Sequence, residues 1–260
     1  MPGVMAITMA GFGSRFAAAG YAQPKYMIEA LGLPLFDWSM AGLSAFRDAG
    51  WRFSFAVRRA DQAAAFIRGR CEGLGIGIAA FVELDEPTDG QATTALLLAR
   101  ASEPGLPFAI FNIDTFVAPG AMAPAQVPEG CAGWVPCFPA PGDGWSFARL
   151  DGAGRVVELR EKVRISPHAT VGLYWFQSSQ LYQDSYAGYY GQGGREEMGE
   201  RYVAPLYNHL IAAGRDVRIA ELALDDVGML GTPAQVEAFR AAPPLAAARV
   251  AAARAPGGAG

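Results

Sequence analysis

The sequence of 260 residues is poor in cysteine and contains no long apolar run. Its three cysteines, Cys71, Cys131 and Cys137, are odd in number and include no Cys-x-x-Cys pair. This argues against a disulfide framework or a structural zinc site and favours a reducing cytoplasm. No segment approaches the roughly eighteen apolar residues of a membrane span, and no basic region precedes the apolar start. We therefore expect neither a membrane protein nor a signal peptide.

The chain also has fewer basic than acidic residues. The formal net charge is −4 and the isoelectric point is near 5.3, whereas binding to nucleic acid generally needs a basic surface that replaces phosphate counterions. Hydrophobic residues make up 52% of the chain, which is ample for a single core at this length. We expect one domain over residues 1–240, no nucleic-acid partner, and a flexible tail rich in Ala, Pro and Gly over residues 241–260.

Two familiar glycine loops are missing. No Gly-x-x-x-x-Gly-Lys-Ser/Thr run occurs, and a dinucleotide-binding loop would need a third glycine where this chain has Phe16. What is present is an apolar run that ends in Gly-Phe-Gly-Ser-Arg at residues 11–15. The pattern predicts a buried strand that delivers a glycine loop to the edge of a sheet, where backbone N–H groups can bind an anion. Ser14, Arg15 and Lys25 add donors that suit a polyphosphate.

Strand and helix patterns alternate from residue 4 to residue 84, which is typical of βαβ units with a parallel sheet. After residue 130 the pattern changes to short strands, two of them joined by a turn at residues 151–154, which predicts a hairpin region. The expected helices cover residues 35–46, 60–74 and 95–101, and the expected strands cover residues 4–10, 54–57, 76–84, 108–115, 133–138, 145–150, 155–162, 170–176 and 216–224.

The glycine loop, followed by Pro24-Lys25, resembles the Gly-x-Gly-x-Arg and Pro-Lys signature of the nucleotidyltransferases that make nucleotide sugars. The resemblance runs through five ordered blocks over about residues 4–240. It implies a single Rossmann-like (GT-A-like) α/β domain, with a mixed, mostly parallel central sheet and an added β-hairpin acceptor region. It also implies attack of an acceptor phosphate on the α-phosphorus of a nucleoside triphosphate, release of pyrophosphate, and Mg²⁺ as cofactor.

The resemblance carries roles to matching residues. Asp114 ends the strand predicted over residues 108–115 and matches a Mg²⁺ ligand, and Asp226 falls on a second metal carboxylate, a role that Asp225 could take instead. The implied contacts are Ala10, Gly11, Gly13, Ser14, Gly90 and Gln91 with the nucleotide, Arg15 and Lys25 with the reacting phosphates, and Glu161, Lys162 and Gly172 with the acceptor.

One departure from the family pattern and several alternatives stay open. Many relatives have Pro or a small residue after Pro-Lys, whereas this chain has Tyr26, which leaves the acceptor open: a sugar phosphate or another small phosphomonoester. An aromatic run at residues 202–208 resembles a segment at the acceptor end of the site in relatives devoted to surface polysaccharides; the alternative is a core segment, since aromatic residues at such spacing are more often buried. The competing hypotheses are a nucleotide-sugar-dependent glycosyltransferase of the related fold and a non-catalytic nucleotide sensor. The base stays open, and the resemblance is compatible with a homo-oligomer.

Overall fold

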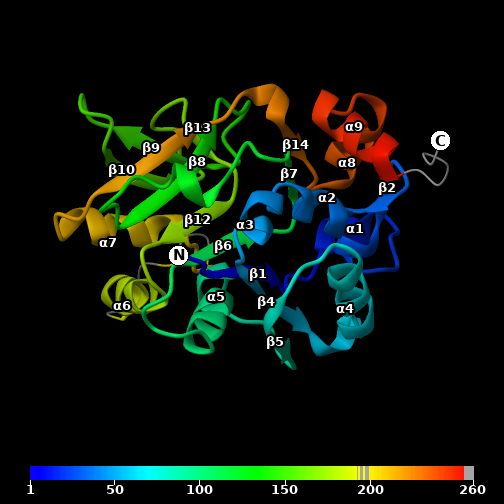
Figure 1. The fold of residues 1–260 in the computed structure, drawn as a ribbon, viewed down its shortest axis with the longest axis horizontal. Coiled ribbons are helices and arrows are strands. Elements are labelled where there is room, and N and C mark those ends of the chain that lie inside the picture. The colour runs from blue at the N-terminus through cyan, green and yellow to red at the C-terminus, as the bar shows by residue number, and fades with distance from the viewer. Residues whose placement is uncertain (192, 194–195, 197–198, 255–260) are drawn as a thin grey trace.

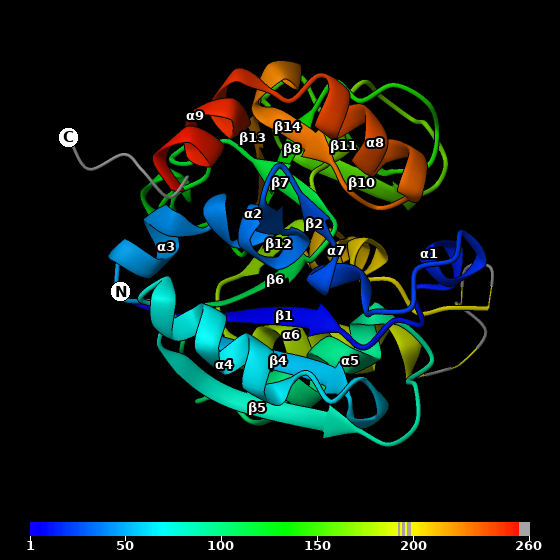
Figure 2. The same cartoon turned by 90° about the vertical axis from the view of Figure 1, so that its right-hand side faces the viewer.

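The computed structural model describes residues 1–191, 193, 196 and 199–254, and its centre is a ten-stranded mixed sheet (Figure 1). The strand β1 (Val4–Met9) runs parallel to both of its neighbours, β4 (Arg52–Arg58) and β6 (Phe108–Asn112). Beyond β4, the strand β5 (Ile78–Leu84) is also parallel. This half of the sheet confirms the predicted α/β class, and Figure 2 shows β1 running between β6 and β4 with β5 at the edge.

On the other side of β6 the sheet becomes mostly antiparallel. The strand β12 (Leu173–Phe176) is antiparallel to β6 and to β8 (Gly133–Phe138), and β9 (Ser146–Leu150) forms a hairpin with β10 (Val156–Glu161). The hairpin predicted from the turn at residues 151–154 is therefore present. Two further strands complete this half: β11 (Ala169–Thr170), antiparallel to β8 and β9, and β13 (Val217–Glu221), parallel to β8.

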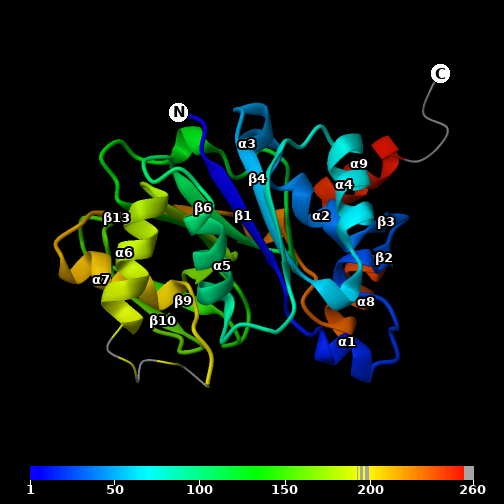
Figure 3. The same ribbon diagram turned by 90° about the horizontal axis from the view of Figure 1, so that it is seen from below.

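Helices cover both faces because side chains alternate along buried strands. On β1, Met5 and Ile7 pack into one apolar cluster, whereas Val4 and Ala6 pack into another. Figure 3 shows α5 and α6 side by side beneath β1 and β6. The first face carries α2 (Leu35–Ala41), α3 (Ser44–Asp48) and α4 (Ala64–Gly73), and the second carries α5 (Gln91–Arg100), α6 (Ser179–Tyr190) and α7 (Tyr207–Ala212).

A third apolar cluster lies under the C-terminal helices, and it corrects the expectation of a flexible tail. Residues 245–254 form a helix whose Ala247 is fully buried. Residues 255–260, the remainder of the predicted tail, lie outside the described part of the chain. The elements around this cluster are α1 (Ser14–Ala18), β2 (Glu29–Ala30), β3 (Leu33–Pro34), β7 (Thr115–Val117), β14 (Val227–Met229), α8 (Pro233–Ala241) and α9 (Leu245–Arg254).

Two predicted helices are interrupted where the backbone leaves the helical conformation. The helix expected over residues 35–46 divides into α2 and α3, because Leu43, with φ −101° and ψ 9°, departs from helical geometry before α3 begins. The helix expected over residues 60–74 begins only at residue 64, because Gln62 has a φ of +48°. Short 3₁₀ helices are η1 (Lys25–Met27), η2 (Arg59–Asp61), η3 (Pro124–Gln126), η4 (Ala204–Leu206) and η5 (Leu224–Asp226).

Within the described residues, no helix combines the length and the apolar character needed to cross a bilayer.

Candidate active site

A cavity of about 520 Å³ lies where β1, β4 and β6 end. These strands are parallel, so their carboxyl ends meet at one edge of the sheet, the usual position of ligands in open α/β sheets. Its lining includes residues 8–14, 24–26, 58, 61, 87–91, 94, 112–114, 199 and 200.

The glycine loop forms one wall of this cavity. Gly13 has a φ of +60°, in the left-handed region that glycine tolerates, and its carbonyl oxygen accepts hydrogen bonds from the N–H groups of Phe16 and Ala17. The loop thus turns sharply from β1 into α1. Among the predicted nucleotide contacts, Ala10, Gly11, Gly13 and Ser14 all line the cavity.

Arg15 is the exception within this loop. Its side chain is exposed, and among the described residues that line the cavity Arg15 does not appear. It follows Ser14, the first residue of the short helix α1. The structure therefore brings the backbone of the loop to the cavity but not the guanidinium of Arg15, which was expected to contact the reacting phosphates.

Lys25 and Asp114 form an ion pair on the wall of the cavity. The Nζ atom of Lys25 lies 3.3 Å from Oδ2 of Asp114, and the two side chains are 17% and 37% exposed. Asp114 does not end a strand as predicted, because β6 stops at Asn112 and Asp114 occupies the turn before β7. The carbonyl oxygen of Asp114 accepts a hydrogen bond from the N–H of Leu230, which joins this turn to the end of β14.

The structure does not bring Asp226 to this carboxylate. In the β7–β14 ladder, Asp114 lies opposite Leu230, whereas Asp226 lies opposite Ala118, four residues further along. At about 3.3 Å per residue, the backbones of Asp114 and Asp226 are roughly 13 Å apart. The alternative ligand, Asp225, lines a different cavity, beside α8.

Within the described ranges, no cluster of three or more His, Cys, Asp or Glu side chains could hold a metal ion. Mg²⁺ is commonly bound by one or two carboxylates together with water and substrate phosphates, so a single accessible Asp114 suits a metal that arrives with a nucleotide.

Gln91 is held by two polar residues that the sequence analysis did not assign. Its Nε2 atom donates to Oγ1 of Thr8, at 3.2 Å, and to Oδ1 of Asn112. Asn112 is in turn packed against Gly172, where a Cβ atom would lie 2.7 Å from the Asn112 Nδ2 atom. Gly172 therefore makes room for Asn112 instead of lining the cavity itself. A polar residue at the end of an otherwise apolar strand was the signal that could have identified Asn112.

Tyr26 contacts the β4 side of the cavity. Its hydroxyl donates to Oδ2 of Asp61 at 3.1 Å, and Oδ1 of the same carboxylate accepts from Nη2 of Arg58. Burial raises the pKa of Tyr26, and the neighbouring Asp61 raises it further, so the phenol stays a donor. The sheet order puts β4 on the opposite side of β1 from the hairpin, so Tyr26 lies away from the predicted acceptor region.

Arg58 is a further cavity residue that sequence reasoning missed. Its guanidinium carbon lies 5.3 Å from the ring centre of Phe12, an exposed aromatic residue in the glycine loop. Lys25 and Arg58 are the only cationic side chains among the described residues that line the cavity. Against them stand the four carboxylates of Asp61, Asp89, Asp114 and Glu200, which leaves a formal charge of −2.

The predicted acceptor residues form a separate polar cluster on the hairpin. Glu161 accepts a hydrogen bond from Ser146, and Ser146 lies 3.3 Å from the hydroxyl of Tyr174, whose pKa burial raises. Lys162 has a φ of +52°, and its Nζ atom donates to the hydroxyl of Tyr202 at 2.6 Å. Neither Glu161 nor Lys162 is among the described residues that line the cavity.

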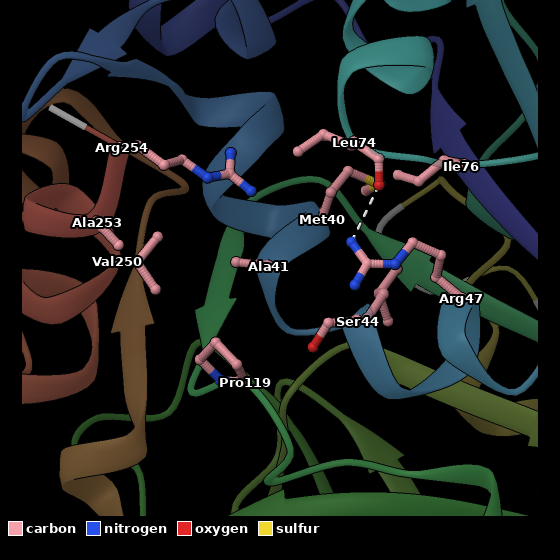
Figure 4. A pocket seen from close by; sticks show the side chains of 11 residues that line it. Met40, Ala41, Ser44, Arg47, Leu74, Ile76, Pro119, Val250, Ala253 and Arg254 are labelled. Atoms are coloured by element: carbon pink, nitrogen blue, oxygen red, sulfur yellow. Dashed lines mark hydrogen bonds between the residues drawn. The ribbon is translucent and has the colours of Figure 1, made fainter. Parts of the chain in front are cut away.

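A smaller cavity, of about 190 Å³, lies apart from all predicted site residues, between α2, α3 and α9 (Figure 4). Arg47 crosses one side of it and donates to the carbonyl oxygen of Leu74 at 3.0 Å, and Arg254 borders the other side. Most of its remaining lining is apolar, as with Met40 and Val250. With both arginines engaged in protein contacts, this cavity offers no counterpart to the polar lining of the larger one.

Comparison with solved structures finds close similarity over nearly the whole chain. The nucleoside-diphosphate-sugar pyrophosphorylase from Vibrio cholerae RC9 shares 36% sequence identity, with a TM-score of 0.83 over 92% of this chain and 100% of that one. Two more distant structures share the fold. The inositol-1-phosphate CTP transferase from T. maritima has 14% identity, a TM-score of 0.72, and coverage of 90% and 91%. A Bacillus anthracis protein assigned as a glucose-1-phosphate thymidylyltransferase, in complex with a sucrose, has 15% identity, a TM-score of 0.71, and coverage of 91% and 93%. No family model matches the sequence, and neither does any curated protein.

Proposed function

The chain belongs to the sugar-phosphate nucleotidyltransferase family, and from that premise we propose how its residues carry out the transfer of a nucleotide to a sugar phosphate. The observation that carries the proposal is the convergence of the glycine loop, Lys25 and Asp114 on one cavity at the ends of parallel strands. In the reaction, an acceptor phosphate oxygen attacks the α-phosphorus, a new P–O bond forms, and the bond to the bridging oxygen of pyrophosphate breaks. An ionised phosphate monoester needs no proton transfer to react, so positioning and charge neutralisation supply the catalysis.

We assign binding of the triphosphate to the glycine loop and Lys25. Backbone N–H groups of residues 11–14 and the Ser14 hydroxyl are suited to phosphate oxygens. Lys25 is mostly buried and already points at Asp114, so its charge is oriented before substrate arrives. Arg58, fixed by Asp61, is the second cation we assign to the nucleotide side.

We propose Mg²⁺ as the cofactor, with Asp114 as its protein ligand and phosphate oxygens completing the site. The formal charge of −2 on the cavity side chains supports this, because a free triphosphate would be repelled. When bound, the ion would neutralise charge on the phosphates that react and leave. Lys25, already held 3.3 Å from Asp114, would then add a second positive charge beside the phosphates.

We assign the acceptor phosphate to Lys162 and the acceptor itself to the hairpin side of the sheet. The support is the position of Lys162 at the end of β10, where Tyr202 holds its Nζ atom, and the presence of Glu161 beside it. In this assignment one lysine contacts each polyanionic substrate: Lys25 contacts the triphosphate and Lys162 contacts the acceptor phosphate. The acceptor is a sugar phosphate or a similar small phosphomonoester.

We also propose that the product serves surface polysaccharide assembly in the cytoplasm. The aromatic run at residues 202–208 supports the pathway through its similarity to relatives with that role. The compartment is supported by Cys71, Cys131 and Cys137, which are all buried free thiols, as expected of a reducing environment.

Pyrophosphate release tests the proposal. CTP, UTP, dTTP, GTP and ATP, each with Mg²⁺, are crossed against a panel of sugar 1-phosphates and other small phosphomonoesters. We expect release with one triphosphate and one acceptor, and a loss of about a hundredfold to a thousandfold in Lys25→Ala and Asp114→Ala. Asp48→Ala, an exposed carboxylate on α3, is the matched control.

Two outcomes would contradict the proposal. Near-normal rates in folded Lys25→Ala and Asp114→Ala would remove both residues from the chemistry. Turnover of a nucleotide sugar without pyrophosphate release would favour a glycosyltransferase instead. Asp226→Ala tests whether Asp114 is the metal ligand alone or together with Asp226. A loss of activity equal to that of Asp114→Ala would restore Asp226 as a ligand.

A further inference from the structure

Residues 199–202 connect the nucleotide cavity to the lysine assigned to the acceptor. Gly199 and Glu200 line the cavity, and Tyr202 accepts the hydrogen bond from Lys162. Between them, Arg201 contacts the turn that carries Gly90 and Gln91. One short segment thus contacts both predicted substrate regions.

The backbone of Arg201 pairs with both sides of Gly90. Its N–H donates to the carbonyl oxygen of Asp89 at 2.8 Å, and its carbonyl oxygen accepts from the N–H of Ala92 at 2.9 Å. Gly90 has a φ of +142°, and a Cβ atom there would lie 2.5 Å from the N and O atoms of Arg201. A side chain at position 90 would therefore separate the two segments, which gives this glycine a role in holding Arg201.

The side chain of Arg201 reinforces the same contact. Its guanidinium forms an ion pair with Asp89 at 3.1 Å and with Glu196 at 2.9 Å. It also donates to the hydroxyl of Tyr186 on α6 at 2.8 Å, and Tyr186 lies 2.6 Å from Oγ1 of Thr93. These contacts fix the guanidinium between the nucleotide turn and α6, and they leave it outside the cavity lining.

Tyr202 continues the connection toward the hairpin. Its hydroxyl lies 2.6 Å from Nζ of Lys162, its ring centre lies 4.6 Å from the same atom, and its carbonyl oxygen accepts from the hydroxyl of Tyr190. Tyr190 thus holds the backbone of Tyr202, and the Tyr202 side chain contacts the lysine. A change in the position of the nucleotide turn would be transmitted through two adjacent residues to Lys162.

We propose that Arg201 is a positioning residue that couples nucleotide binding to the placement of Lys162. A nucleotide that contacts Gly90 and Gln91 would fix the turn, the turn would fix residue 201, and Tyr202 would then hold Lys162 for the acceptor phosphate. This inference rests on the proposed function, in which residues 90 and 91 contact the nucleotide. Its consequence is that the triphosphate prepares the acceptor side before the acceptor binds.

The lysine content of the chain permits a direct test. Lys25 and Lys162 are the only lysines in the 260-residue sequence, so a lysine-selective acetylating reagent reports on one group of each substrate side. Trace acetylation of the full chain, read by mass spectrometry, is measured with and without each of the five triphosphates and Mg²⁺. Protection of Lys25 identifies a bound triphosphate, and the rate at Lys162 reports the coupling.

In the wild type, we expect the triphosphate that protects Lys25 to slow acetylation of Lys162 by about fivefold or more, the lower end of typical coupling between two sites. In Arg201→Gln at saturating triphosphate, Lys25 stays protected and the effect on Lys162 falls, because the guanidinium contacts with Asp89 and Tyr186 are lost while the two backbone hydrogen bonds of residue 201 remain. Tyr202→Phe removes the hydroxyl contacts with Lys162 and Glu200 but keeps the ring beside Lys162, and the effect on Lys162 falls there too. Arg218→Gln is the matched control, because Arg218, on β13, pairs with the preceding Asp216 and its loss is expected to keep the coupling.

The possible failures are distinguishable. If no triphosphate protects Lys25, the proposed function fails and the coupling fails with it. If Lys25 is protected but Lys162 does not respond, or responds equally in Arg201→Gln, the coupling alone is refuted. Should Arg201→Gln fail to fold, Tyr202→Phe still decides, since it leaves every contact of the Arg201 guanidinium in place.

Discussion

A methyl group added at Gly172 should disturb the nucleotide side of the site from a position outside the cavity. Gly172 has a φ of +86°, and a Cβ atom there would lie 2.7 Å from Nδ2, 2.8 Å from Cγ and 3.0 Å from Cβ of Asn112. Asn112 can yield only by moving, and its side chain holds Gln91. Gly172→Ala therefore combines backbone strain with displacement of a cavity residue.

A matched variant separates these two effects. Gly154 has a similar φ of +73°, but the nearest atom to an added Cβ is 4.0 Å away. Gly154→Ala should cost about 1 to 2 kcal/mol, the usual penalty for a non-glycine residue in the left-handed region. Gly172→Ala should cost about 1 to 3 kcal/mol more, because close packing must also give way.

Urea unfolding followed by circular dichroism measures the two free energies of unfolding, and pyrophosphate release measures activity. We expect kcat/KM for the triphosphate to fall by about tenfold to a hundredfold in Gly172→Ala, since a displacement of about 1 Å at a site can have that effect. Gly154→Ala should keep its activity. Equal losses of stability and equal activity in the two variants would refute the role given to the contact between Gly172 and Asn112.

Three further perturbations test other parts of the structure. Tyr26→Phe removes the hydroxyl that donates to Asp61, so we expect steady-state kinetics to show a higher KM for the triphosphate and an unchanged KM for the acceptor. A higher KM for the acceptor with an unchanged KM for the triphosphate would put Tyr26 on the acceptor side. Arg254→Ala removes one of the two arginines that pair with the fully buried Asp37 and should lower the free energy of unfolding by about 1 to 3 kcal/mol, measured in urea; no change would mean that the pair between Arg254 and Asp37 adds nothing to stability. Burial raises the pKa of the Cys131 thiol to about 11, against about 8.5 unfolded, so its contribution to stability is complete below about pH 8.5 and is lost as the pH rises toward 11. Iodoacetamide should therefore alkylate it slowly in the native protein at pH 8 and quickly in urea, and equal rates would contradict its burial.

Much of the site could be predicted from the sequence because it depends on local backbone geometry. Two glycines after an apolar strand already specify a tight turn at a sheet edge, and the structure has Gly13 in the left-handed conformation next to the cavity. The Pro-Lys pair likewise brings Lys25 to the same place. These features require only residues that are close in sequence.

Features that depend on register or on long-range pairing were not predictable in the same way. Asp226 matched a motif in sequence, but its distance from Asp114 is set by the β7–β14 ladder, which places Leu230 opposite Asp114. Arg15 matched as well, yet its side chain lies outside the cavity lining that the structure describes. The contact between Gly90 and Arg201 joins residues more than a hundred positions apart, and no local pattern specifies it.

The error at the C-terminal segment has a different origin. Residues 245–254 are rich in alanine and arginine, and a segment rich in Ala, Pro and Gly was expected to be a flexible tail. Alanine is the best helix former, and the same segment forms α9. Composition alone does not distinguish a flexible tail from a helix that finds a surface to pack on.

The pairing of Asp37 with two arginines has a consequence for the order in which the protein matures. Arg70 donates to Asp37 from α4, only 33 positions away, whereas Arg254 lies 217 positions away in the sequence. During synthesis the N-terminal strands and α4 can assemble early, but the second partner of this buried carboxylate does not exist until residue 254 has been made. The last described turn of the chain thus supplies the second arginine to a carboxylate in one of the first helices, so a nascent or truncated chain would hold Asp37 of α2 with Arg70 as its one arginine partner.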